Sequence, residues 1–156
     1  MIKAQSNIKD KNINTPRHAS RIAAVQALYQ IAQTSTDCQK VVHQMILSSF
    51  DTIKQEGYVA PDKEFFEQLV VESSAQFAAL DEEIQPHLSD NWRIERLASV
   101  LLMILRLGIF ELKSCLTIPK TVVINEYIEI TKAFFPGGNE TRFVNSVLDK
   151  AAKLIR

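Results

Sequence analysis

The sequence predicts an all-α protein that folds as one domain or as two small subdomains sharing a core. Apolar residues recur at the three- and four-residue spacing of helices along most of the chain. Only 4 Gly and 5 Pro interrupt 156 residues, and these two residues are the strongest breakers of regular structure. With 46% hydrophobic residues, the chain can bury a core and is not disordered.

The first predicted helix follows a polar, basic and aperiodic stretch, residues 1–14, which we expect to be a flexible basic tail. Thr15 suits the N-cap and Pro16 the first helical position, and the helix should extend to about Gln33. Its core stripe comprises Ala24, Ala27, Leu28 and Ile31.

Basic residues crowd the start of this helix. Arg17, His18 and Arg21 fall in its first two turns, and Tyr29 lies further along the same flank. Positive charge at a helix N-terminus opposes the macrodipole, at a cost of a few tenths to about 1 kcal/mol. A bound phosphate would reverse the sign of this effect. The alternative is that exposed arginines tolerate a small penalty.

Two further helices complete an expected N-terminal bundle. The second runs from Asp37 to about Glu56 and stops at Gly57. The third starts at Ala60-Pro61-Asp62. The residues expected to face inward are Val42, Met45, Ile46, Ser49, Phe50 and Ile53 on the second, and Phe66, Leu69, Val70, Ser73 and Phe77 on the third.

A short polar helix is expected next. Asp81-Glu82-Glu83 suits a capped helix start that Pro86 limits. No apolar pocket surrounds these carboxylates in the sequence, so we interpret them as a solvated helix start rather than a general acid.

The C-terminal half begins at Trp92 and should hold three helices. Residues 97–112 are nearly all apolar, which predicts a buried central helix. Arg106 interrupts this run, which is too short to span a membrane. A second helix follows Pro119, with Val123, Tyr127, Ile130 and Phe134 at helical spacing. Pro136-Gly137-Gly138 ends it. The last helix has Asn139 as its expected N-cap and a stripe of Phe143, Val144, Val147, Leu148, Ala151, Leu154 and Ile155.

Charge is distributed unevenly although the net charge is zero. Residues 1–21 carry five basic groups and one acidic group, residues 37–91 carry 11 acidic and 3 basic groups, and residues 92–156 carry 10 basic and 6 acidic groups. Basic ends around an acidic centre suit either solvated faces or a nucleic acid bound at one side.

Chemical motifs are sparse, which favours a binding module over an enzyme. His18, His43 and His87 have no metal-ligand spacing, and the chain has no Gly-rich phosphate loop or nucleophile elbow. We therefore expect no catalytic residue, metal or cofactor. Cys38 and Cys115 form no C-x-x-C pair, and no secretory signal is visible. These features indicate a cytoplasmic protein.

Four blocks in the chain resemble the NusB family. They read RHASRIAAVQALYQ, ILRLGIFEL, IPKTVVINEYIEITKAF and RFVNSVLDKAA, and they cover most of the chain from Arg17 onward. The region from residue 34 to 90 matches only in helical pattern. The resemblance implies a NusB-like bundle of about seven helices in two subdomains, which we place at residues 15–88 and 89–156.

The resemblance also implies a function. NusB proteins are transcription antitermination factors that bind boxA, a short single-stranded RNA element of nascent, chiefly ribosomal RNA transcripts. They bind it with NusE, a protein of the small ribosomal subunit, and join an antitermination complex on RNA polymerase. By position, the implied RNA-binding residues are Arg17, His18, Arg21, Tyr29, Lys120, Asn139, Arg142 and Phe143. We expect the starts of the first and last helices to share one RNA strand. Formation of a homodimer is left open.

The chain departs from the family pattern at two places. His18 and Ala19 thin the arginine run of the first helix. Leu101-Leu102 stand where members often carry an acidic-basic pair, whose acidic member faces NusE. Leu101 is therefore our candidate NusE contact, either exposed or buried.

Two residues each have an alternative role, and the chain has two alternative functions. Phe143 suits core packing or base stacking, and Asn139 suits a helix cap or a phosphate contact. A NusB-like domain also occurs in some ribosomal RNA cytosine methyltransferases, but no cofactor-binding segment follows here. A helix-turn-helix DNA binder needs a basic recognition helix, and the last helix has no compact base-reading face.

Overall fold

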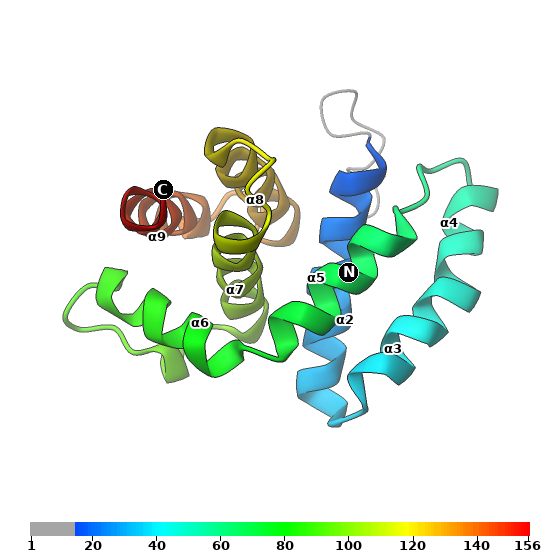
Figure 1. The fold of residues 1–156 in the computed structure, drawn as a ribbon, viewed down its shortest axis with the longest axis horizontal. Coiled ribbons are helices and arrows are strands. Elements are labelled where there is room, and N and C mark those ends of the chain that lie inside the picture. The colour runs from blue at the N-terminus through cyan, green and yellow to red at the C-terminus, as the bar shows by residue number, and fades with distance from the viewer. Residues whose placement is uncertain (1–14) are drawn as a thin grey trace. The chain divides into compact units, whose positions relative to one another are not determined.

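A computed structural model describes residues 15–156 of the chain (Figure 1). The predicted tail, residues 1–14, lies outside the described residues. The described part forms helices and no strand, which confirms the all-α prediction. It has seven helices when α3, η2 and α4 are counted as one continuous helix.

The elements follow one another in this order: α2 (Pro16–Thr34), α3 (Cys38–Gln44), the π-helical turn η2 (Met45–Ser49), α4 (Phe50–Gln55), α5 (Lys63–Ser74), α6 (Phe77–Ile84), the 3-10 turns η3 (Gln85–His87) and η4 (Ile94–Arg96), α7 (Ser99–Ser114), α8 (Lys120–Phe134) and α9 (Glu140–Ile155).

The described residues divide into two compact units, residues 15–75 and residues 76–156. This places α6 in the second unit, where it packs against α7. The expected division into subdomains at residues 15–88 and 89–156 stays a prediction.

In the first unit, α2 packs mainly against α5, and α3 contacts both (Figure 1). Helix α2 begins as predicted, because Thr15 Oγ1 accepts the backbone N–H of His18 at 3.1 Å and Pro16 occupies the first helical position. At the start of α5, the Asp62 carboxylate accepts the backbone N–H of Phe65 at 3.0 Å. Such caps satisfy N–H groups that have no partner within the helix.

The second predicted helix is continuous but contains a π-helical turn that its periodicity did not predict. Ser48 Oγ donates to Gln44 O at 2.6 Å, and Thr52 Oγ1 donates to Ser48 O at 3.0 Å. Such side-chain bonds to the preceding turn compete with the helical ladder. The helix ends as predicted at Gly57, whose φ of +86° lies in the left-handed region that favours glycine.

In the second unit, α7 lies among α6, α8 and α9 (Figure 1). Gly108 permits close contact between α7 and α9, since an added Cβ would lie 2.8 Å from Leu148 Cδ2. The buried Tyr127 hydroxyl donates to the buried Glu111 carboxylate and links α8 to α7. The prediction of a buried central helix is confirmed.

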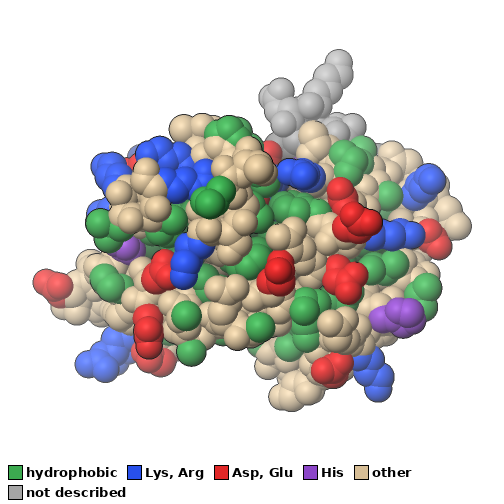
Figure 2. Space-filling model, viewed as in Figure 1, with side chains coloured by type: hydrophobic (Ala, Val, Ile, Leu, Met, Phe, Trp, Pro, Cys, Tyr) green, Lys and Arg blue, Asp and Glu red, His purple; other side chains and the backbone are tan. Residues whose placement is uncertain are grey.

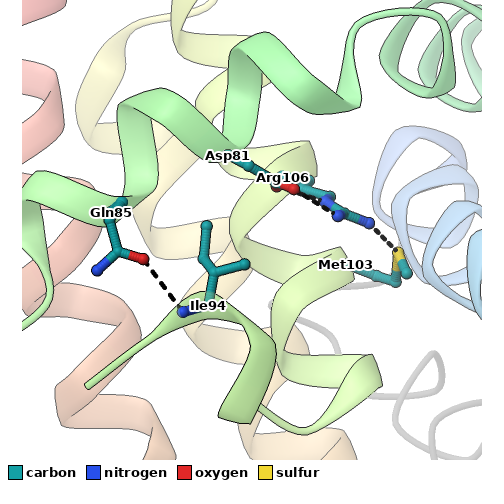
Figure 3. Close-up of polar contacts among 5 residues, drawn as sticks. All are labelled: Asp81, Gln85, Ile94, Met103 and Arg106. Atoms are coloured by element: carbon teal, nitrogen blue, oxygen red, sulfur yellow. Dashed lines mark hydrogen bonds and ion pairs between the residues drawn. The ribbon is translucent and has the colours of Figure 1, made fainter.

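The short polar helix was predicted incorrectly in its start, and two of its three carboxylates, those of Asp81 and Glu83, are paired with basic side chains whereas Glu82 is exposed. Helix α6 begins at Phe77, whereas the sequence predicts Phe77 on the preceding helix. The partly buried Asp81 carboxylate accepts Arg106 Nε and Nη2, each at 2.7 Å (Figure 3). The Arg106 guanidinium also lies 4.1 Å from the centre of the Phe77 ring. The Glu83 carboxylate accepts Lys113. Sequence periodicity cannot show such pairs, because their members are far apart in the chain.

The loop after α6 folds back on that helix. Gln85 Oε1 accepts the backbone N–H of Ile94 at 3.2 Å (Figure 3), and Gln85 Nε2 donates to Trp92 O at 3.2 Å. These bonds fix the segment that leads from α6 into α7.

The end of α9 differs from the predicted stripe, because Leu154 is largely exposed. The Arg156 guanidinium instead turns to the end of α7, where it donates to the carbonyls of Leu112 at 2.9 Å and Cys115 at 3.1 Å, and to Ile118 O at 2.7 Å. Arg156 therefore satisfies Leu112 O, one of the carbonyl groups that an α-helix leaves unpaired at its C-terminus, and adds bonds to the loop that follows α7. No helix among the described residues has the length and apolarity needed to span a membrane.

Candidate nucleic-acid interface

The basic block on α2 contains side chains in very different surroundings. Arg17 is exposed, whereas Arg21 is only 3% exposed and His18 is buried as well. Both buried residues make interactions inside the protein. In the folded chain, Arg17 is therefore the member of the block that is open to a ligand.

An aromatic ring lies beside the two arginines. The centre of the Phe65 ring, on α5, is 5.0 Å from Arg17 Cζ and 5.1 Å from Arg21 Cζ. A guanidinium within about 6 Å of a ring centre is attracted by the negative face of the ring. The structure thus gives part of the basic block a partner within the first unit.

Tyr29 is half-buried near the other end of α2. It follows Arg17 by three turns, a rise of about 18 Å along a helix. The structure therefore does not bring Tyr29 and Arg17 together at one point, and their common use would need an extended ligand.

The start of α9 carries the second group of predicted residues. Asn139 occupies the N-cap position, but its side chain makes no capping hydrogen bond, unlike the cap we expected. Asn139 and Arg142 are exposed, and Phe143 is half-buried. All three side chains therefore present at least part of their surface to solvent. The starts of α2 and α9 belong to different units, so their binding of one strand stays a prediction.

A pocket of about 230 Å³ opens beside the start of α9. It is lined by Trp92, Leu97, Leu101, Asn139, Glu140 and Phe143. The structure thus brings together two predicted RNA-binding residues, Asn139 and Phe143, and the predicted partner residue Leu101. Leu101 is 8% exposed, so it forms part of the pocket wall rather than projecting from the surface.

The pocket combines apolar walls with a carboxylate. Trp92, 49% exposed, offers part of an indole ring at its rim. Glu140 Oε2 is buried and has no hydrogen-bond partner among residues 15–156. Apolar walls with few polar groups are typical of sites that bind flat or apolar ligand groups.

Lys120 is exposed at the first residue of α8 and does not line this pocket. On the face drawn in Figure 2, Lys and Arg side chains gather over α8 and α9. Of the exposed basic residues on these two helices, Lys132 pairs with Glu129 at 3.0 Å and Lys153 pairs with Asp149 at 3.4 Å. Lys120, Arg142 and Lys150 make no such ion pair within the described residues, and these three cations can attract a polyanion over distances of about a Debye length.

Sequence reasoning missed four residues beside the candidate site: Phe65, Trp92, Leu97 and Glu140. In the sequence Trp92 marks only the start of the C-terminal half, although a lone Trp after Ser89-Asp90-Asn91 could have indicated an exposed aromatic. Phe65 precedes a core position and gave no signal of its own. The sequence holds no sign that Glu140 would be left without a partner.

Comparisons with known proteins agree with one another. Residues 18–153 match the model of the NusB family. The chain is 39% identical over 139 residues to the Transcription antitermination protein NusB of Caulobacter vibrioides, covering 88% of this chain and 93% of the relative. It is 36% identical over 154 residues to the protein of that name from Maricaulis maris, covering 98% and 96%.

Solved structures show the same fold. T. maritima NusB superposes with a TM-score of 0.71 at 31% identity, covering 89% of this chain and 92% of that one. A crystal structure of the antitermination factors NusB and NusE in complex with dsRNA gives a TM-score of 0.68 at 23% identity, covering 88% and 96%. At that identity the second likeness shows the fold alone.

Proposed function

The chain belongs to the NusB family, and from this premise we propose that it is a transcription antitermination factor. It binds boxA RNA of nascent, chiefly ribosomal RNA transcripts together with NusE. The pair then joins the antitermination complex on RNA polymerase in the cytoplasm. The match of the family model to residues 18–153 carries this proposal.

The relatives favour a free-standing binding factor over an enzyme. Both are named as antitermination proteins, and the matched regions cover 93% and 96% of their lengths. The hypothesis that the chain is the RNA-binding domain of a methyltransferase is therefore not favoured.

The proposed RNA contacts follow from exposure and chemistry. Arg17, Lys120 and Arg142 are exposed cations that can neutralise phosphates. Phe143 is half-buried beside the pocket and can offer ring surface to a base. Asn139, whose side chain is not used as a cap, can donate to or accept from a nucleotide.

We assign roles other than phosphate contact to the remaining residues of the family pattern. His18 and Arg21 are buried, so we propose that they act through the packing of α2 rather than by direct contact with RNA. Tyr29 offers a partly exposed ring further along α2. We propose that NusE contacts the pocket wall at Leu101, where an apolar contact replaces the charged one. A protein of the same fold, NusB, has been crystallised with NusE and dsRNA, and that complex motivates the choice of NusE as the partner to test.

A fluorescence titration tests the proposal. A labelled boxA-type RNA is titrated with the chain, with and without NusE, beside a scrambled RNA and a duplex DNA of equal length. We expect tighter binding to the boxA-type RNA than to either control, and a further gain with NusE. Equal affinity for all three nucleic acids, with or without NusE, would contradict the proposal. Binding of S-adenosylmethionine would support the methyltransferase alternative instead.

A further inference from the structure

The start of α5 is fixed against the first turn of α2. The backbone N–H of Asp62 donates to Pro16 O at 3.3 Å. Ser20 Oγ lies 2.8 Å from Asp62 O and 2.9 Å from Pro16 O, so its single proton serves one or both carbonyls. Because Asp62 also caps α5 through the N–H of Phe65, the backbone of Phe65 has a defined place beside α2.

The Phe65 side chain is buried at this position, next to two positively charged guanidinium groups. Arg17 and Arg21 are one helical turn apart, so they share a flank of α2 and repel each other. Their Cζ atoms lie 5.0 and 5.1 Å from the ring centre. The negative face of an aromatic ring attracts such cations and thereby opposes their repulsion.

The two arginines beside the Phe65 ring differ in their exposure to solvent. Arg21 is only 3% exposed, whereas Arg17 remains exposed. An exposed arginine normally samples many rotamers, and their loss on binding weakens the complex. A ring contact in the free protein restricts Arg17 before any ligand arrives, so less freedom is lost on binding.

We propose that Phe65 is a positioning residue of the RNA-binding site. Its ring holds the Arg17 guanidinium at the start of α2, where that group neutralises a phosphate. Phe65 itself is buried and acts through Arg17. The inference rests on the proposed function and adds a residue that the family resemblance does not supply.

NMR of the free protein tests the positioning without RNA. The Nε–Hε signal of Arg17 is compared in the wild type, Phe65→Leu, Phe65→Tyr and the control Phe66→Leu. Phe66 is buried and packs edge-on against Phe50, with ring centres 4.9 Å apart, so this control removes a neighbouring ring of the same helix.

We expect restricted motion and a ring-current shift of the Arg17 signal in the wild type, Phe65→Tyr and Phe66→Leu. Both should be lost in Phe65→Leu, because leucine has no π face. An Arg17 signal that is unchanged in Phe65→Leu would overturn the inference, whatever the protein does with RNA.

Titration with boxA-type RNA tests the consequence, under conditions where melting curves show every variant folded. Phe65→Leu should weaken binding about two- to fivefold, the range that cation–π energies at exposed sites imply. Phe65→Tyr should restore the affinity, and Phe66→Leu should leave it unchanged. The salt dependence of binding should not change in Phe65→Leu, because no charge is removed.

A double-mutant cycle separates positioning from general damage. In an Arg17→Ala background, Phe65→Leu should cause no further loss of RNA affinity. An equal loss in both backgrounds, or an equal loss for Phe66→Leu, would overturn the inference while leaving RNA binding intact. Absence of RNA binding by the wild type would instead overturn the proposed function, and the Arg17 NMR signal would still decide whether Phe65 orders that side chain.

Discussion

Substitution of Arg17 by alanine should change the salt dependence of RNA binding by an amount that the structure fixes. The sequence places three cationic or titratable groups at the start of α2, but His18 and Arg21 are buried and only Arg17 is exposed. We therefore assign one phosphate contact to this helix start. On single-stranded nucleic acid each contact contributes about −0.7 to the slope of log K against log salt.

The expected change is measurable. Arg17→Ala should flatten the slope by about 0.7, so that a fourfold rise in salt causes a roughly 2.6-fold smaller loss of affinity than in the wild type. The affinity should fall alike for boxA-type and scrambled RNA, because a phosphate contact carries no sequence information. Removal of Arg21 as well should add little to the slope change and should instead lower stability.

The assay is fluorescence anisotropy at four or more salt concentrations, with circular dichroism to show that each variant is folded. Lys153→Ala is the matched control, since it also removes one positive charge. Lys153 is exposed, pairs with Asp149 at 3.4 Å and lies near the far end of α9 from Arg142. Its slope should equal that of the wild type.

Two results would refute this reasoning. A wild-type slope in Arg17→Ala would show that the exposed arginine is only a solvated helix end. Equal flattening in Arg17→Ala and Lys153→Ala would show that RNA responds to net charge and not to a defined contact.

Three further predictions concern stability and the partner. Asp81→Ala should lower the free energy of unfolding by about 2–3 kcal/mol in urea titrations, because the Arg106 and Asp81 side chains are only 12% and 25% exposed; exposed Glu82→Ala is the control. Arg156→Ala should lower the free energy of unfolding by about 1–2 kcal/mol, because it removes bonds to carbonyls at the end of α7. A decrease of less than a few tenths of a kcal/mol would show that Arg156 does not stabilise the end of this helix. Leu101→Asp should lower stability by at least about 2 kcal/mol, and a folded variant that binds NusE with unchanged affinity would exclude a contact there.

Helix positions were largely predictable because their signals are local. Thr15-Pro16 starts α2 through a side-chain cap and a fixed proline φ. Gly57 and Gly137 adopt positive φ where the sequence predicted breaks. Each of these signals depends on a few neighbouring residues and needs no knowledge of the tertiary fold.

Features that depend on distant residues were not predictable. Asp81 looked like a solvated carboxylate until the structure paired it with Arg106, 25 positions away. The π-helical turn at Met45–Ser49 keeps the chain helical and so leaves little trace in the apolar pattern. The capping role of Arg156 requires α9 to end beside α7.

The candidate site shows the same division. The family resemblance supplied Asn139, Phe143 and Leu101, and the structure adds that all three line one pocket. Trp92 and Glu140 complete that pocket from positions with no motif. No periodicity could have shown that a loop tryptophan would line the same pocket as the first turn of the last helix.

The burial of Arg21 changes what positive charge at the start of α2 implies. Positive charge at the start of α2 suggested a phosphate because a lone helix N-terminus disfavours it. The Phe65 ring offers part of that compensation within the protein, at 5.0 Å from Arg17 and 5.1 Å from Arg21. Misplaced charge alone therefore no longer argues for RNA at this helix. What argues for RNA is that one of the two cations stays exposed while its partner is buried beside the same ring, on a chain of the NusB family.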